Sequence, residues 1–209
     1  MTNSCNVIQN KSMLPQQNKQ TIRLLAVATF QSYHGYERVI EGLARYDHEP
    51  TDRKIELYLV GNGEEAIKYK KMVKQYDLEK SVQFCGRRTG SDLDHIYDHM
   101  DIALGSFGMY KEKIYKSSSL KVREYLAKGM PVVCGCCDDA FERQKDYKYC
   151  LEFPNDDSII DMQGIVDFYK AVYESDKERE QIHREIREYA KKTVDLSVTM
   201  QPVIKYICS

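Results

Sequence analysis

The chain has 209 residues, of which 42% are hydrophobic and 30% are charged, as is typical of a folded globular domain. Its 31 Lys and Arg residues nearly balance 32 Asp and Glu residues, which leaves a formal net charge of -1. This balance argues against a nucleic-acid-binding protein and against attraction of the whole surface to an anionic membrane. No apolar run approaches the roughly 18 residues of a membrane span, and residues 1–20 lack the apolar core of a signal peptide. A cytoplasmic location is therefore expected.

The first part of the chain alternates strands and helices after an aperiodic, linker-like segment at 1–20. In chain order we predict a strand at 22–28 that is buried on both faces, a helix at 35–46, a strand at 55–60, a sharp turn at 61–63, a helix at 64–76, a strand at 82–85 and a helix at 91–99. There follow a strand at 102–104, a long loop at 105–119, a helix at 120–128 that stops at Gly129, and strands at 131–134 and 150–153.

The last part of the chain is predicted to be helical, with helices at 158–173 and 176–192 and a short one at 198–208. Strands that alternate with helices indicate βαβ units, hence a parallel sheet with right-handed crossovers. Ligands of such sheets bind at the carboxyl ends of the strands, so the loops at 29–35, 61–63, 86–90, 105–119 and 134–140 are the places to look for a site.

A loop rich in serine leads into the predicted helix at 120–128. Free amides at a helix N-terminus attract anions such as a diphosphate, and Lys121 in the first turn adds positive charge that a cap alone would disfavour. A plain serine cap with a solvated Lys121 explains the same residues equally well. Glu124, one turn further, either accepts hydrogen bonds from a ribose diol or simply faces solvent.

Two other kinds of site find little support in the sequence. Cys134, Cys136 and Cys137 are clustered, but no second pair of cysteines or histidines accompanies them, so reduced and mostly buried thiols are expected rather than a zinc site. No G-x-G-x-x-G follows the first strand, which argues against a dehydrogenase or a flavodoxin-like domain, and no G-x-S-x-G occurs, which argues against a serine hydrolase.

The segment 118–133 reads S-x-L-K-x-x-E-Y-x-A-x-G-x-P-V-V and resembles the donor-site signature of GT-B glycosyltransferases of the retaining group 1, family 4 type. Three further segments resemble that family in the expected order, at 33–40 (H-G-x-x-R-x-I), at 57–63 with 82–86 (G-x-G and V-x-F-x-G), and at 7–10, which is similar to its interdomain linker. The resemblance covers residues 7 to 155. It implies a Rossmann-like α/β three-layer sandwich with a mostly parallel sheet of about six strands plus C-terminal helices. The nucleotide-sugar-binding domain would span 21–157, and helices at 158–209 would pack on it.

The resemblance also implies roles for individual residues. Glu124 would bind the ribose, and Ser118, Ser119 and Leu120 would offer donors to the diphosphate with Lys121 nearby. Gly86 and Arg87 would border the base, Arg88 would neutralise phosphate charge, and His34 and Gly35 would face the phosphates. His34 stands where many relatives carry Lys, so its phosphate binding is expected to depend on pH. Lys116 stands where many relatives carry a Glu that contacts the donor sugar.

The function implied by the resemblance is transfer of a sugar from a nucleoside diphosphate sugar to a saccharide or lipid-linked acceptor in glycan biosynthesis, without a metal or another cofactor. No acceptor domain fits into the 20 residues before the first strand, so activity is expected to require an N-terminal acceptor domain or a partner chain. Peripheral membrane association through that half and a homo-oligomer are both compatible with this reading. The alternative is a module of this fold that binds a nucleotide or a partner without turnover.

Overall fold

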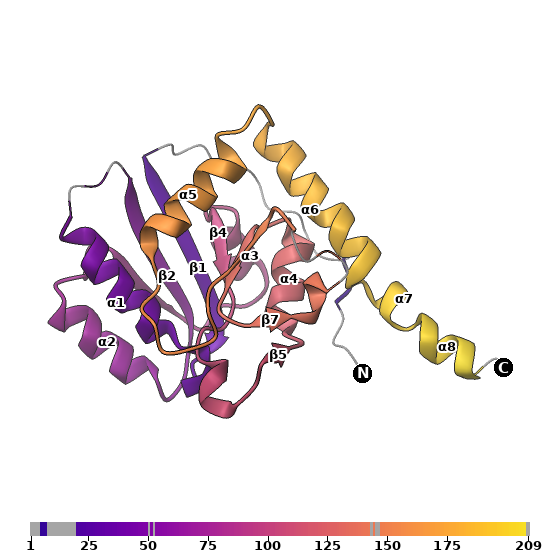
Figure 1. Ribbon diagram of the computed structural model, residues 1–209, viewed down its shortest axis with the longest axis horizontal. Coiled ribbons are helices and arrows are strands. Elements are labelled where there is room, and N and C mark those ends of the chain that lie inside the picture. Colours follow the sequence, from indigo (N-terminus) through magenta and orange to yellow (C-terminus); the bar gives the residue numbers. More distant parts are fainter. Residues whose placement is uncertain are drawn as a thin grey trace.

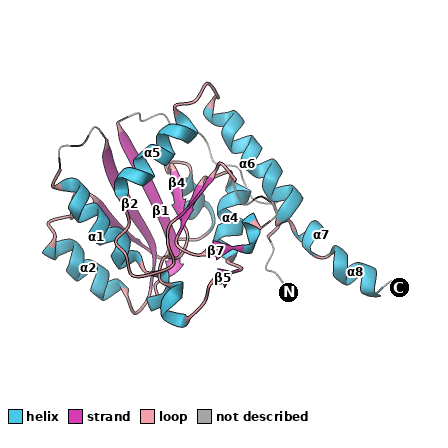
Figure 2. Cartoon of the chain, in the orientation of Figure 1, coloured by secondary structure: helices cyan, strands magenta, loops and turns pink. Residues whose placement is uncertain are grey.

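Six parallel strands form the central sheet of the protein, which a computed structural model describes over residues 5–7, 20–49, 51, 53–142, 144 and 147–207. The strands are β1 (Thr21–Thr29), β2 (Lys54–Asn62), β3 (Val82–Gly86), β4 (Ile102–Leu104), β6 (Val132–Cys134) and β8 (Cys150–Glu152). Their order across the sheet is β3-β2-β1-β4-β6-β8, and every neighbouring pair is parallel. Figure 2 shows the strands in magenta among the helices in cyan. The order reverses direction between β1 and β4, which is where ligands of such sheets bind.

Helices cover both faces of the sheet (Figure 1). One face carries α1 (Tyr36–Asp47), α2 (Ala66–Gln75) and α5 (Met162–Tyr173), and the other carries α3 (Gly90–Tyr97), α4 (Leu120–Lys128) and α6 (Arg179–Thr193). Shorter elements are η1 (Ser32–His34), η2 (Met109–Glu112), β5 (Lys116–Ser117), β7 (Cys137–Asp138), η3 (Asp139–Phe141), α7 (Leu196–Thr199) and α8 (Gln201–Ile207). This confirms the Rossmann-like three-layer sandwich with a parallel sheet.

The sequence of β1 explains why both faces are covered. Ile22, Leu24 and Ala26 are fully buried against α1, α2 and α5, whereas Leu25 between them is fully buried against the α3, α4 and α6 layer. Successive side chains of a strand point to opposite faces, so a run of apolar residues needs a helical layer on each side.

The serine-rich loop leads into helix α4, which packs on the sheet and is fixed at its C-terminus. Val122, Tyr125 and Leu126 are buried at helical spacing. At the C-terminus, Gly129 has a left-handed φ of 87°, and the amides of Gly129 and Met130 donate to the carbonyls of Leu126 (3.0 Å) and Tyr125 (2.9 Å). These two bonds form a Schellman motif, which confirms the predicted stop at Gly129.

All six predicted strands and the first four predicted helices are confirmed, but some boundaries differ. The helix predicted at 158–173 begins only at Met162, because the Asp161 side chain accepts from the Gln163 amide and caps it there. The predicted last helix is divided into α7 and α8, with Asp195 capping the first. The two-residue strands β5 and β7, which pair in parallel, were missed because they are too short for any periodicity.

Residues 5–7 lie against the C-terminal helices. The Cys5 amide donates to Val194 (3.1 Å), the Leu196 amide donates to Cys5 (2.9 Å), and the Val7 amide donates to the Asp195 carboxylate (2.9 Å). The rest of the predicted linker, apart from Gln20, lies outside the described residues. From this anchor α7 and α8 project away from the body of the domain (Figure 1). None of the helices in the described ranges combines the length and apolar character that crossing a membrane requires.

Candidate functional site

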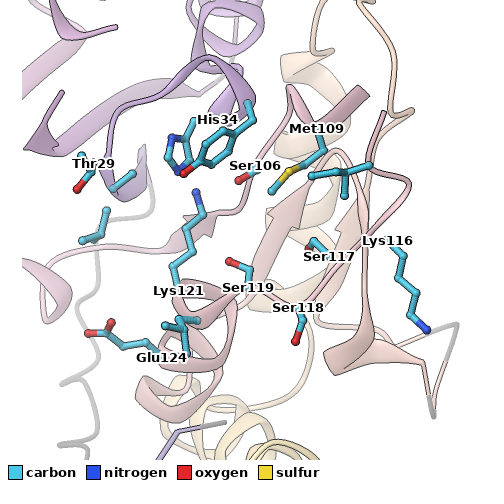
Figure 3. A pocket seen from close by; sticks show the side chains of 15 residues that line it. Thr29, His34, Ser106, Met109, Lys116, Ser117, Ser118, Ser119, Lys121 and Glu124 are labelled. Carbon is cyan, nitrogen blue, oxygen red and sulfur yellow. The ribbon is translucent and has the colours of Figure 1, made fainter. Parts of the chain in front are cut away.

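A cavity of about 710 Å³ opens at the carboxyl edge of the sheet, between the end of β1 and the loop after β4 (Figure 3). This is the point where the strand order reverses. Seven of the predicted site residues line it, namely His34, Lys116, Ser118, Ser119, Leu120, Lys121 and Glu124. The other lining residues are Val27, Ala28, Thr29, Tyr33, Ser106, Met109, Ile114 and Ser117.

The upper wall of the cavity is built by two loops that are hydrogen-bonded to each other. The amide of Phe107 donates to the carbonyl of His34 (2.8 Å), and the amide of Gly108 donates to Tyr33 (3.1 Å). Gly35 lies at this junction with φ of 65°, and a Cβ built on it would be 2.4 Å from the Gly108 nitrogen. Gly35 does not line the cavity. A glycine is needed here because the two backbones approach too closely for a side chain.

The lower wall is the serine-rich loop, and Asp138 on β7 anchors it. The Asp138 carboxylate accepts from the Ser117 hydroxyl (2.7 Å) and from the Ser119 amide (3.0 Å). Arg123, which is almost fully buried, pairs with Asp138 (3.3 Å) and with Asp139. Burial raises the pKa of Asp138 although the hydrogen bonds from Ser117 and Ala140 oppose this effect.

The N-terminus of α4 faces the cavity with amides that have no intrahelical partner. Ser119 was predicted to offer a backbone or hydroxyl donor, and of these its amide already donates to Asp138, which leaves the hydroxyl for that role. The amides of Leu120 and Lys121 come next in the first turn, and no acceptor for them occurs among the described residues. Such amides, together with the helix dipole, favour an anion.

Lys121 rises from the first turn of α4 toward His34 (Figure 3). Its ammonium donates to the Tyr36 hydroxyl (3.0 Å) and lies 5.3 Å from the centre of the Tyr36 ring. Within the described residues it makes no ion pair with a carboxylate. Desolvation lowers the pKa of Lys121 to about 7, because the charge of Asp138 compensates only in part. An anion in the cavity would stabilise the charged form.

His34 is buried and neutral. Its Nδ1 accepts from the Gln31 amide (3.0 Å), so the ring proton is on Nε2. Burial, with a contribution from the Lys121 charge, lowers the pKa of His34 to about 3. This burial argues against the expected pH-dependent phosphate binding by His34, because it keeps the ring neutral at physiological pH in the ligand-free site. The ring can act only as a neutral hydrogen-bond donor.

Two polar groups complete the cavity. The Glu124 carboxylate lines it and makes no ion pair with the described residues, so it is able to accept hydrogen bonds from a ligand. The Ser106 hydroxyl also lines it and is buried without a hydrogen-bond partner in the part of the chain that the structure describes. A buried hydroxyl without a partner costs about 1–3 kcal/mol, which a ligand acceptor would recover.

The remaining predicted residues lie elsewhere. Lys116 is at the rim, and its ammonium points away from the cavity (Figure 3) to pair with Glu142. Arg87 and Arg88 line a second cavity of about 570 Å³, which shares the end of β1 with the first. Gly86 lines neither, and a Cβ built on it would meet nothing within 4 Å.

Sequence reasoning missed several lining residues and the loop anchor. Thr29 is the last residue of β1, and Tyr33 and Ser106 come shortly after the ends of β1 and β4, where parallel topology already marks ligand-binding segments. The second cavity is completed by Val60, Gly61, Asn62 and Gly63 with the end of β1. Asp138 carries no local signal, because its role depends on contacts with Ser117 and Ser119.

The cysteines do not form a metal centre in the described ranges. Six of them, namely Cys5, Cys85, Cys134, Cys136, Cys137 and Cys150, are free thiols. No group of three or more His, Cys, Asp or Glu side chains among the described residues is placed to hold a metal ion.

Residues 9–192 match the family described as Glycosyl transferases group 1. No curated protein sequence matches the chain significantly.

Among solved structures, a glycosyltransferase from Rickettsia africae superposes with a TM-score of 0.67 at 16% identity, covering 90% of this chain and 48% of that one. HepE of Anabaena, in complex with UDP and glucose, gives a TM-score of 0.65 at 16% identity, with coverages of 90% and 48%. Sucrose-phosphate synthase from Thermosynechococcus elongatus gives 0.69 at 17% identity, with coverages of 98% and 50%. These identities establish a shared fold only, and the chain spans about half the length of these structures.

Proposed function

Because this chain belongs to the group 1 glycosyl transferases, we propose that its cavity binds a nucleoside diphosphate sugar as the donor for transfer to a saccharide or lipid-linked acceptor in glycan biosynthesis. The observation that carries the proposal is the meeting of Lys121, the first-turn amides of α4 and the Ser106 hydroxyl in one cavity. All three lack an anionic partner within the described residues, and a diphosphate offers acceptor oxygens to each of them.

The proposed position of each part of the donor follows from the placement of these polar groups. The diphosphate lies over the N-terminus of α4, next to Lys121 and the neutral His34. Glu124, one turn further along α4, accepts hydrogen bonds from the ribose hydroxyls. Arg87 and Arg88 in the second cavity are exposed cations on the side where the base is proposed to lie. The shared end of β1 connects the two cavities.

Leaving-group charge is proposed to be stabilised by Lys121 and the helix amides without a metal ion. Preorganised donors of this kind in a partly desolvated site stabilise developing phosphate charge, which is the main electrostatic requirement of the step. The acceptor site is proposed to come from an N-terminal acceptor domain or a partner chain, because this chain spans about half the length of the solved glycosyltransferase structures that it resembles. The UDP complexes of HepE make UDP-sugars the first donors to test.

The proposal is tested by calorimetric titration with UDP, GDP and ADP and with their glucose or mannose derivatives. We expect micromolar binding of one base series, weakened about tenfold in Glu124→Gln, because one carboxylate oxygen is replaced by an amide group that cannot accept and the other hydrogen bond loses its charge assistance. Glu180→Gln, at an exposed position in the first turn of α6, is the matched control and keeps wild-type affinity. Absence of binding at millimolar concentration for every nucleotide would overturn the proposal.

A second function remains to be separated from the first, namely nucleotide binding without transfer. The observation that favours it is Lys116, whose ammonium pairs with Glu142 and contributes no polar group to the cavity. Sugar release from the bound donor, measured with and without a candidate acceptor half and its acceptor, separates the two. Release only with the acceptor half supports transfer, and binding with no release in either case supports the module.

A further inference from the structure

The further inference concerns Tyr36, a residue that lies behind the cavity wall and is absent from its lining. We propose that Tyr36 is a positioning residue, whose buried hydroxyl holds the Lys121 ammonium at the place where the donor diphosphate binds. The proposal rests on the proposed function for the identity of the ligand, but the geometry of the pair is a property of the chain itself.

The geometry of the pair fixes a side chain that would otherwise be mobile. A lysine on a four-carbon stem gives up about 2 kcal/mol of rotamer entropy when it is held in one place. Here the Tyr36 hydroxyl accepts from the Lys121 ammonium at 3.0 Å, and the charge lies 5.3 Å from the centre of the ring, beyond its hydroxyl end. The hydrogen bond to the phenol therefore holds the ammonium in one place.

Tyr36 is itself held rigidly. It has no exposed surface and contacts the rings of Phe30, Phe107 and Tyr69 edge-on, with centroid distances of 6.0, 6.4 and 6.2 Å. On its other side it stacks with His34 at 5.7 Å and 12°. A ring fixed on several sides places its hydroxyl within narrow limits, as a binding site requires.

The electrostatic surroundings explain why a neutral acceptor at this position matters. The charged and titratable groups around Lys121 are the neutral His34, Tyr36, Asp138 from β7 and Glu124 on α4 itself. Asp138 is already occupied by Arg123 and two loop donors. A carboxylate at position 36 would form an ion pair with the ammonium and neutralise its charge. A neutral phenol holds the ammonium in place without neutralising it, so that the charge can attract a phosphate.

The same pair predicts that donor binding is coupled to proton uptake. With the pKa of Lys121 lowered to about 7 in the empty site, the amine is largely charged below pH 7 and increasingly neutral above it. A bound diphosphate favours the charged form and raises the pKa. Affinity should therefore be constant below pH 7 and fall by up to about tenfold per pH unit above it, until the pKa of the complex is reached.

The test compares Tyr36→Phe with Tyr69→Phe. Both remove one hydroxyl from the same aromatic cluster, but it is the Tyr36 hydroxyl, and not that of Tyr69, to which the Lys121 ammonium donates. UDP-glucose and uridine are titrated into each variant between pH 5.5 and 8.5. We expect Tyr36→Phe to weaken UDP-glucose binding about tenfold at pH 7, to leave uridine binding unchanged and to move the pH midpoint downward. Tyr69→Phe should behave as wild type.

A second measurement needs no ligand and therefore separates this proposal from the proposed function. The pKa of Lys121 is measured in the empty protein from the ¹³Cε shift, assigned with Lys121→Met. Tyr36→Phe should lower that pKa by about one pH unit, because the charged amine loses its hydrogen bond. An unchanged Lys121 pKa, or equal losses for uridine and UDP-glucose, would overturn the positioning role. If the wild type binds no nucleotide but Tyr36→Phe still lowers the Lys121 pKa, the proposed function alone is overturned.

Discussion

Glycines at positive φ show how one residue type serves different purposes in this domain. Gly35 and Gly86 have nearly the same φ, 65° and 66°. Around Gly35 the backbone of Gly108 is so close that a side chain cannot fit, whereas Gly86 has nothing within 4 Å of a built Cβ. Both match the family pattern, so only the structure separates the packing role of Gly35 from the open position of Gly86.

This difference predicts unequal effects of alanine. Gly86→Ala should cost about 1–2 kcal/mol, the usual penalty of a left-handed alanine. Gly35→Ala should cost about 2 kcal/mol more, because the backbone at Phe107 and Gly108 must move to admit a methyl group. Urea unfolding of the two variants measures the difference. Equal losses would show that the contact between Gly35 and Gly108 is looser than described.

At the scale of elements, two short strands hold the serine-rich loop in place. β5 and β7 pair over only two residues each, so their ladder alone is weak. Asp138 strengthens it by accepting from Ser117 and Ser119 while pairing with the buried Arg123. The N-terminus of α4 is thereby presented to the cavity in a fixed position before any ligand arrives.

We therefore predict that Asp138→Asn lowers the free energy of unfolding by about 3 kcal/mol, because it leaves the buried Arg123 with one carboxylate partner. Donor affinity should fall as well, since the loop loses its anchor. Asp156→Asn is the control, because Asp156 is an exposed partner of Arg38 and its loss should leave the unfolding midpoint nearly unchanged. Urea unfolding of the two variants measures this difference. Superposable unfolding curves of Asp138→Asn and Asp156→Asn would contradict the anchoring role of Asp138.

For the whole molecule, the sequence was sufficient for the architecture. Apolar runs such as 22–28 and 131–134 can be buried only in a parallel sheet covered on both sides, and the alternation with helices predicts the layers. The location of the cavity followed as well, because parallel topology brings the loops at 29–35 and 105–119 to one edge. The Ser118–Glu124 segment was predicted to lie there, and it does.

What the sequence could not give depends on contacts between distant residues. Burial beside Lys121 makes His34 a neutral donor, which no local pattern reveals. The direction of Lys116 is set by Glu142, and the loop is anchored by Asp138 on a strand too short for a period. The roles of Gly35 and Tyr36 likewise depend on loops that fold over them.

A further cavity of about 560 Å³ lies on another part of the molecule, between residues 147–149 and α6. Its lining includes Tyr147, Tyr189, Arg184 and Glu188. It is an alternative place for a ligand, so the claim that the donor binds in the cavity at the carboxyl edge of the sheet should be tested against it.

The most direct test of that claim is a ¹H–¹⁵N correlation spectrum of the chain titrated with UDP-glucose, followed by GDP-mannose and ADP-glucose. We expect one donor to shift the amides of Leu120 and Lys121 together with those of Thr29 and His34, since all four residues line one cavity. Shifts confined to residues 147–149 and α6, or no shifts with any donor at millimolar concentration, would contradict it.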